Sequence, residues 1–291
     1  MNRILGIVNP ISGGTDKQTI VRLLRESLGP ESGLDIRFTE GPGDATRIAR
    51  ETEADTVLAI GGDGTVAEVA AGLLDSNKTL GIIPCGSGNG LALHLGISRH
   101  PGKAVETLKN GRIERIDCGM LGDRPFFCTA GIGFDAEVAW RFAHADSRGL
   151  KTYITEALHC WSHYRPCQYT LDMDGRTETL TAVIITVGNA NQWGNNARIT
   201  PLASVQDGLL DITVVAPFHT AEIPLLAAQL MDGHAYNNRR ARHFRCKSVS
   251  IIREEEGPAH FDGEPCRLGK EIRIQIRPSA LRVIVPPDSI I

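Results

Sequence analysis

The stretch from Asp55 to Asp75, DTVLAIGGDGTVAEVAAGLLD, runs from an apolar segment through a glycine-rich turn into a second apolar segment. Residues 55–60 form a run of strand length, and residues 65–75 repeat their apolar positions at helical spacing. Between them stands Gly61-Gly62-Asp63-Gly64. Because Gly-Asp-Gly is also ordinary turn chemistry, this stretch alone leaves open whether Asp63 belongs to a turn or to a binding site.

The same alternation of strand and helix extends through residues 1–119. Closing glycines and apolar periodicity predict strands at 3–8, 34–40, 55–60, 80–84 and 113–119, and helices at 16–29, 45–51, 65–75, 91–97 and 104–110. Strands that alternate with helices indicate a parallel sheet with helices on both faces. We therefore expect an α/β domain over residues 1–119.

The pattern changes at about residue 120. A strand-like segment at 125–134 and two helical segments at 135–143 and 151–163 come first. Strands separated by turns then follow at 167–175, 179–189, 208–215, 245–254, 258–265, 271–277 and 280–287. This pattern favours an antiparallel sheet or β-sandwich over residues 120–291.

Composition excludes several classes of protein. The net charge is −3 and aromatic residues make up 5% of the 291 residues, which argues against a nucleic-acid partner. The chain has no apolar run of about 18 residues that would span a membrane. Its seven cysteines contain no Cys-x-x-Cys pair, so we expect a reduced, cytoplasmic protein.

Three glycine-rich loops each follow a predicted strand of the first domain: NPISGG (9–14), GGDGT (61–65) and PCGSGNG (84–90). In a parallel sheet such loops gather at the carboxyl edge of the strands. Glycine lets backbone N–H groups close around an anion, and each loop precedes a helix whose amino end favours negative charge. Together the loops predict a phosphate-binding site. The one match to a dinucleotide motif, GIGFDA (131–136), lies outside the parallel-sheet pattern, and packing of the following helix explains it better.

Acidic residues accompany these loops. A carboxylate beside bound phosphates needs a cation, and Mg²⁺ supplies one, so Asp63 is expected to face magnesium-nucleotide. Asp262 and Glu264 stand in HFDGEP (260–265), which is also compatible with a hairpin turn. Asp207 and Asp211, in VQDGLLDITVV (205–215), fit either a divalent cation or a turn.

These motifs, in this order along nearly the whole chain, resemble the diacylglycerol kinase catalytic-domain family, which includes bacterial lipid kinases, sphingosine kinases and ceramide kinases. TAGIGFDAEV, NARITPLASVQDGLLDITVV and IRPSALRVIVPP carry the resemblance beyond the glycine loops. The Gly-Gly-Asp-Gly loop by itself is shared with NAD kinases and phosphofructokinases. The full set of motifs in this order is more specific to the lipid kinases than that loop alone.

The resemblance implies an NAD-kinase-like α/β domain and a C-terminal β-sandwich with the active site between them, and it allows the end of the chain to pack back on the first domain. It implies transfer of the γ-phosphate of ATP to a primary hydroxyl of a lipid. Diacylglycerol, giving phosphatidic acid, is the first choice of acceptor, and a sphingoid base is the alternative. The implied cofactors are ATP and Mg²⁺. The implied partner is a lipid at a membrane surface, reached by peripheral contact, and a homodimer is also compatible.

The resemblance also assigns residues. Asp63 would lie at the phosphates and metal, and Asp262 and Glu264 would activate the lipid hydroxyl, with Glu264 the first choice of proton acceptor. A structural Mg²⁺ would use Asp207 and the carbonyl groups of Ser204 and Leu209. The nucleotide would be lined by Asn9, Thr39, Gly61, Gly62, Asp63, Gly64, Thr65, Val66, Ala67, Gly86, Ser87, Gly88 and Asn89.

Two departures from the family pattern bear on these assignments. Leu202 stands where the family often has an aspartate near the metal, and PCGSGN is closer to sphingosine and ceramide kinases than to bacterial diacylglycerol kinases. An NAD kinase relative and a non-catalytic nucleotide or lipid sensor remain as alternatives.

Two other patterns have ordinary explanations. His159 and His163 share a helix face, as in zinc sites, but without a third well-spaced ligand they indicate a half-buried helix surface. Arg239, Arg240 and Arg242 indicate either a solvated loop or a contact with anionic headgroups.

Overall fold

The computed structural model describes residues 3–13, 16–145 and 150–290, with side chains omitted for 150–154. The chain forms two compact units. Unit 1 contains the described residues up to Cys118, the short segment Val205–Asp207 and the described residues from Pro278 onward. Unit 2 contains Gly119–Ser204 and Gly208–Arg277.

Unit 1 is built on a parallel sheet with the strand order β2-β1-β3-β4. These strands are β1 (Ile4–Val8), β2 (Leu34–Phe38), β3 (Thr56–Gly61) and β4 (Thr79–Pro84). The last part of the long strand β16 (Glu271–Val285) continues this sheet, because Arg282 and Val283 pair in parallel with β4. Nearly every residue of β3 and β4 is buried, so both faces of the sheet are covered.

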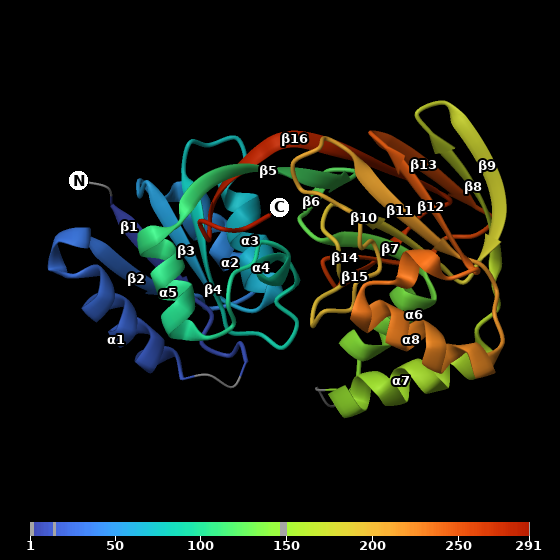
Figure 1. The fold of residues 1–291 in the computed structure, drawn as a ribbon, viewed down its shortest axis with the longest axis horizontal. Helices are drawn as coiled ribbons and strands as arrows, with labels where there is room; N and C mark the ends of the chain where they lie inside the picture. Colours follow the sequence, from blue (N-terminus) through green and yellow to red (C-terminus); the bar gives the residue numbers. More distant parts are fainter. Residues whose placement is uncertain (1–2, 14–15, 146–149, 291) are drawn as a thin grey trace. The chain divides into compact units, whose positions relative to one another are not determined.

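The helices that accompany this sheet in the described part of unit 1 are α1 (Lys17–Leu28), α2 (Asp44–Glu51), α3 (Asp63–Leu73), α4 (Gly90–His94) and α5 (Pro101–Asn110), with a short 3₁₀ helix at Pro30–Ser32. Helix α1 begins where the Asp16 carboxylate accepts the amides of Gln18 and Thr19. It packs with α5, whereas α2 packs with α3 (Figure 1). The α2–α3 contact depends on Gly72, since a Cβ there would lie 2.5 Å from the Thr46 carbonyl oxygen.

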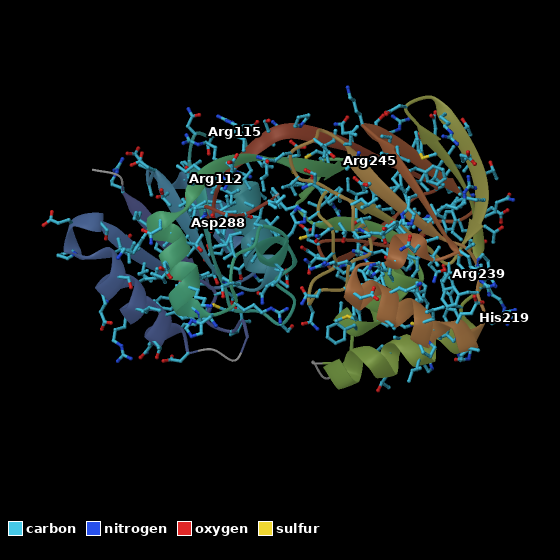
Figure 2. All side chains as sticks on the ribbon, in the orientation of Figure 1. Arg112, Arg115, His219, Arg239, Arg245 and Asp288 are labelled. Carbon is cyan, nitrogen blue, oxygen red and sulfur yellow. The ribbon has the colours of Figure 1, made fainter. Side chains whose placement is uncertain are left out.

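The C-terminal tail belongs to unit 1. Arg112, at the start of β5, donates from Nη2 to the carbonyl oxygen of Ser289 at 2.8 Å and from Nη1 to that of Pro287. Ser289 in turn donates its hydroxyl to the Leu95 carbonyl oxygen at 2.6 Å. Figure 2 labels Arg112 and the tail residue Asp288.

Unit 2 contains two antiparallel sheets that enclose one core. The first has the order β12-β11-β10-β7-β14-β15, and the second has β16-β13-β8-β9. The core between them includes the fully buried Phe126, Leu171 and Ile185. Besides the first part of β16, the strands of unit 2 are β5 (Arg112–Leu121, which begins in unit 1), β6 (Arg124–Phe126), β7 (Thr129–Gly133), β8 (Cys167–Met173), β9 (Arg176–Ala182), β10 (Ile184–Gly188), β11 (Leu210–Val215), β12 (Ala241–Cys246), β13 (Ser248–Arg253), β14 (Gly257–Phe261) and β15 (Glu264–Leu268).

The helices of unit 2 are α6 (Phe134–Ala143), α7 (Leu150–His163) and α8 (Ile223–Asp232), with 3₁₀ helices at Thr220–Glu222 and Ala235–Asn237. A second apolar cluster joins Ile184 and Val215 of the first sheet to Leu226 of α8 and Trp161 of α7. Figure 1 shows the three helices gathered on this side of the unit. No helix among the described residues is long and apolar enough to cross a membrane.

The predicted α/β class of the first part and the antiparallel class of the second are confirmed. Several predicted strands were wrong in extent. Segments 179–189 and 245–254 each divide into two strands that belong to different sheets, β9 with β10 and β12 with β13. The apolar run Ala182-Val183-Ile184 cannot reveal the first corner, because its buried side chains continue through the change of sheet. The second corner is the single residue Lys247 between β12 and β13. Segments 271–277 and 280–287 instead join into the single strand β16.

Candidate functional site

The three glycine-rich loops meet at the carboxyl ends of β1, β3 and β4, with their backbones in direct contact. A Cβ on Gly13, whose φ is +61°, would lie 1.7 Å from the carbonyl oxygen of Cys85. A Cβ on Gly86 would lie 2.7 Å from the Cα of Gly62. The loops need glycine because no side chain fits between them. Gly14, the last residue of the first predicted loop, lies outside the described residues.

Asp63 joins two of these loops. One carboxylate oxygen accepts the amide of Asn89 at 2.8 Å and the other accepts the amide of Gly90 at 2.6 Å. Asp63 stands in the first turn of α3 but caps the amino end of α4. Each oxygen retains further lone-pair capacity, so the expectation that Asp63 faces a metal stays a prediction.

Two other residues of the last loop hold its shape. Asn89, buried and at φ +54°, accepts the Gly86 amide at 2.9 Å and donates to the Gly86 carbonyl oxygen at 2.5 Å. Arg99 donates to the carbonyl oxygen of Gly88 at 3.0 Å. The sequence analysis did not identify Arg99, because it lies beyond the motif.

Lys17 was also missed. It is 7% exposed at the start of α1, and its Nζ donates to the Ser12 carbonyl oxygen of the first loop. Burial raises the pKa of the neighbouring Cys85 thiol, and the charge of Lys17 opposes that rise. The sequence signal that could have identified Lys17 was its position directly after the helix cap Asp16, behind a glycine loop.

A pocket of about 290 Å³ opens beside these loops. Its wall includes Asn9, Thr39, Gly62, Gly64 and Thr65, all predicted to contact a nucleotide. The remaining lining residues are Pro10, Ile11, Ser12, Glu40, Gly41, Pro42, Ala45 and Glu68. The amino end of α3 faces this pocket, and no described side chain caps it.

The other predicted nucleotide residues support this wall or stand next to it. Gly61 and Val66 are buried, and Ala67 is half-buried within α3. A Cβ on Gly61 would lie 2.4 Å from the hydroxyl oxygen of Thr65, so this glycine lets the helix start close to β3. Gly86, Ser87 and Gly88 belong to the neighbouring loop, where Ser87 is exposed.

Asp262 and Glu264 lie in unit 2, around a tight hairpin turn between β14 and β15. Asp262 has φ +47° and Gly263 has φ +82°, the left-handed pair of a type I′ turn. The Asp262 carboxylate accepts the amides of Phe127 at 2.7 Å, Cys128 at 2.7 Å and Thr129 at 3.1 Å. The turn is therefore anchored to the start of β7, and Glu264, the first residue of β15, is exposed.

A buried polar pair lies two residues before this turn. His260 Nε2 is 3.0 Å from Asp135 Oδ2, and these residues are 4% and 8% exposed. A Cβ on Gly131 would lie 2.4 Å from His260 Nε2 and 2.5 Å from Asp135 Oδ2. The first glycine of GIGFDA thus makes room for this pair, in agreement with a packing role for that motif.

The predicted metal ligands Ser204, Asp207 and Leu209 lie where the chain passes from unit 2 to unit 1 and back. Asp211, the other acid of that motif, pairs with Arg245 at 3.3 Å. Within the described ranges, no group of three His, Cys, Asp or Glu residues could hold a metal ion. His159 and His163 do share a face of α7, with ring centroids 5.3 Å apart, but without such a group they stay a surface pair.

Comparison with protein families assigns both halves of the chain. Residues 3–121 match the diacylglycerol kinase catalytic domain, and residues 128–285 match the YegS C-terminal NAD kinase beta sandwich-like domain.

Individual relatives agree with these matches. A probable lipid kinase YegS-like from Chromohalobacter salexigens is 30% identical, with 91% of this chain and 89% of the relative covered. A diacylglycerol kinase from Bacillus subtilis is 30% identical, with 91% and 90% covered.

Solved structures extend the comparison to the fold. A putative diacylglycerol kinase from Bacillus anthracis superposes with a TM-score of 0.83 at 26% identity, covering 99% of both chains. An NAD kinase from Archaeoglobus fulgidus in complex with ATP, with a TM-score of 0.56 at 14% identity over 97% and 93% of the chains, shares the fold. With both domain matches in chain order and relatives that span nearly its whole length, this chain belongs to the diacylglycerol kinase-like family of lipid kinases.

Proposed function

We propose that this protein transfers the γ-phosphate of ATP to the primary hydroxyl of a lipid, with diacylglycerol as the acceptor. The observation that carries the proposal is the pocket at the carboxyl ends of β1 and β3, where a glycine loop and the amino end of α3 meet. Membership of the kinase family supports the reaction type, and the name of the Bacillus subtilis relative supports the acceptor.

The pocket has the chemistry that a nucleotide phosphate requires. The amino end of an 11-residue helix presents backbone N–H groups and the positive end of its dipole. Gly62 and Gly64 allow a phosphate to approach the backbone closely, and Asn9 and Thr39 add polar side chains to the wall. Phosphoryl transfer depends mainly on such positioning and charge stabilisation.

Asp63 acts on this pocket indirectly in our proposal. By accepting the amides of Asn89 and Gly90, it holds the third glycine loop beside the second. Mg²⁺ would enter with ATP, since it binds phosphate oxygens while keeping several waters. When bound, it would neutralise phosphate charge, and the remaining lone pairs of Asp63 are compatible with a place near that ion.

Glu264 is the proposed acceptor of the lipid hydroxyl proton. The Asp262 carboxylate already accepts three backbone amides, so much of its hydrogen-bonding capacity is used to hold the turn. Glu264 is exposed and follows the rigid turn by one residue. Asp262 would position the turn, and Glu264 would act as the general base.

The proposed structural Mg²⁺ site fits the residues only weakly. Asp207 supplies one carboxylate, Leu202 is an exposed hydrophobic residue where the family often has an acid, and backbone carbonyls of Ser204 and Leu209 would complete the set. We assign no step of the reaction to this ion.

The test uses labelled ATP with Mg²⁺, a panel of lipids in mixed micelles and chromatography of the products. We expect labelled phosphatidic acid from diacylglycerol. A labelled sphingoid phosphate instead would identify the acceptor suggested by the Ser-Gly-Asn loop. Labelled NADP from NAD would identify an NAD kinase, and normal ATP binding without any labelled product would identify a sensor.

The Glu264→Gln variant tests the base. It should fold normally and bind ATP like the wild type, while kcat falls about 10²–10⁴-fold. Glu254→Gln, which changes another exposed glutamate of unit 2, is the matched control and should keep full activity. Unchanged kcat in Glu264→Gln would remove Glu264 from this role.

A further inference from the structure

Helix α8 has an apolar face turned toward solvent. Leu226 is buried and Leu230 packs partly buried in the helix cluster, so one side of α8 contacts the body of unit 2. On the other side, Leu225 is 58% exposed and Met231 is 53% exposed. The helix IPLLAAQLMD has no charged residue before Asp232. A helix that is apolar all round is ordinarily buried on all sides.

The outward face is continuous. Pro224, Ala227, Ala228 and Met231 are all exposed, and their spacing places them with Leu225 on one side of the helix. Tyr236, 41% exposed, stands on the 3₁₀ helix that packs against α8. We call the exposed side chains of Pro224, Leu225, Ala227, Ala228 and Met231 the α8 face.

Basic groups stand at both ends of the α8 face. At its amino end, Glu222 pairs with Arg239 at 3.1 Å and with Arg240 at 2.9 Å. The two guanidinium groups, with the His219 amide, lower the pKa of Glu222 to about 2, so this acid stays ionised and offsets only one of the two positive charges. Figure 2 shows His219 and Arg239 together at this end.

At the carboxyl end, Arg198 is exposed, and its backbone amide donates to the Leu230 carbonyl oxygen at 2.8 Å. Asp232 pairs there with His234 at 3.1 Å. The rim thus has three guanidinium groups, two of them paired with Glu222, against two carboxylates, in a chain whose overall net charge is −3.

We propose that the α8 face docks on an anionic lipid bilayer, with its apolar side chains among the acyl chains and Arg198 and Arg239 at the headgroups. This inference rests on the proposed function, because a diacylglycerol acceptor resides in a bilayer. An interfacial helix combines an apolar face with basic residues at its border, and tyrosine favours the same interface.

The size of the α8 face argues against a second copy of this chain as its partner. A stable protein interface takes about 20–30 residues from each side, whereas this face offers five side chains on a ten-residue helix. A bilayer has no such minimum, since each inserted side chain contributes separately.

The experiment is co-sedimentation of the full chain with vesicles of phosphatidylcholine, alone or mixed with phosphatidylglycerol. We expect the wild type to bind the anionic vesicles and to dissociate as salt increases. The double variant Leu225→Glu/Met231→Glu should lose binding by about tenfold or more, since it places charge in the apolar region. Ile252→Glu on β13, which replaces another exposed hydrophobic residue of unit 2 at 48% exposure, is the matched control and should bind like the wild type.

A thermal melt checks that the double variant is folded, and Leu225→Ser/Met231→Ser provides a milder change if it is not. Equal binding by the wild type and a folded double variant would overturn the proposal. The absence of vesicle binding by the wild type would also overturn it. If, in that case, the variants changed the oligomeric state in solution, the α8 face would be assigned to contact with a second copy of this chain.

Kinase assays separate this proposal from the proposed function. With a short-chain diacylglycerol that is monomeric in water, the double variant should keep wild-type activity, because no docking is needed. Vesicle binding that depends on the α8 face, without phosphorylation of any lipid, would support docking and contradict the proposed function. Loss of activity on the monomeric lipid in the folded variant would overturn docking as the role of this face.

Discussion

Two aspartates that stand next to glycine in the sequence hold loops in place by hydrogen bonds to backbone amides. Asp63 accepts two amides of α4, and Asp262 accepts three amides around the start of β7. For Asp63, a glycine of the third loop gives the carboxylate access, because a Cβ on Gly88 would lie 2.5 Å from Asp63 Oδ2. Such carboxylates fix the positions of loops, and the proposed phosphoryl transfer depends on such positioning.

Removing the Asp63 carboxylate should therefore affect stability as well as activity. In Asp63→Ala the amides of Asn89 and Gly90 lose their acceptor, and we expect the free energy of unfolding to fall by about 1–3 kcal/mol. Urea denaturation measures this change, with Glu31→Ala, an exposed acid of unit 1, as a control expected within about 0.5 kcal/mol of the wild type. Equal midpoints for the two variants would contradict a structural role for Asp63.

At the scale of elements, the site is a set of loops packed backbone against backbone. The strands end beside one another because the sheet is parallel, and the glycines allow the loops to touch. Lys17 and Arg99 then connect these loops to α1 and to the segment after α4. The pocket is a product of this packing, so a change that only separates the loops should alter it.

Gly13→Ala tests the packing. Its new methyl group would meet the Cys85 carbonyl oxygen at 1.7 Å, and its φ of +61° disfavours any side chain, so the first loop must move away. We expect affinity for ATP to fall about tenfold or more, corresponding to about 1.4 kcal/mol, as measured by calorimetric titration. Gly269→Ala, where a Cβ meets nothing within 4 Å, should bind ATP normally; equal affinities would show that the loop contact does not shape the site.

The fold of the whole molecule buries most of its cysteine side chains, and this burial controls how reactive their thiols are. All seven cysteines are free thiols, and six are buried while Cys167 is exposed. Burial raises the pKa of the Cys160 and Cys266 thiols, and that of Cys246 to about 12. Thiolates are the reactive form, so these buried groups combine low access with a low population of thiolate.

When the native protein is treated with a dithionitrobenzoate reagent near neutral pH, one thiol, that of Cys167, should therefore react rapidly. The remaining six thiols should react only after denaturant is added, to a total of seven. Cys167→Ser should abolish the rapid phase. A rapid phase of two or more thiols in the folded protein would contradict the burial described for the others.

Strand and helix positions in unit 1 were predictable because local signals agree there: glycines and aspartates terminate helices, and buried parallel strands appear as short apolar runs. The corner between β9 and β10 was not predictable, because the apolar run from Ala182 to Ile184 continues through the change of sheet. The corner between β12 and β13 was not identified either, because it is a single residue, Lys247. Helix α8 was not identified either, since its apolar residues lack the polar face that marks a surface helix.

The sequence by itself determined the family, the class of each half and the positions of the glycine-rich loops, because motif order and glycine positions are properties of the chain. Only the tertiary structure decided what the acids do. The carboxylates of Asp63 and Asp262 find their partners 26 or more residues away, and hydrogen bonds between such distant residues leave no periodic signal. Likewise, only the folded protein shows that the apolar residues of α8 remain exposed, because their exposure depends on which other segments pack against the helix.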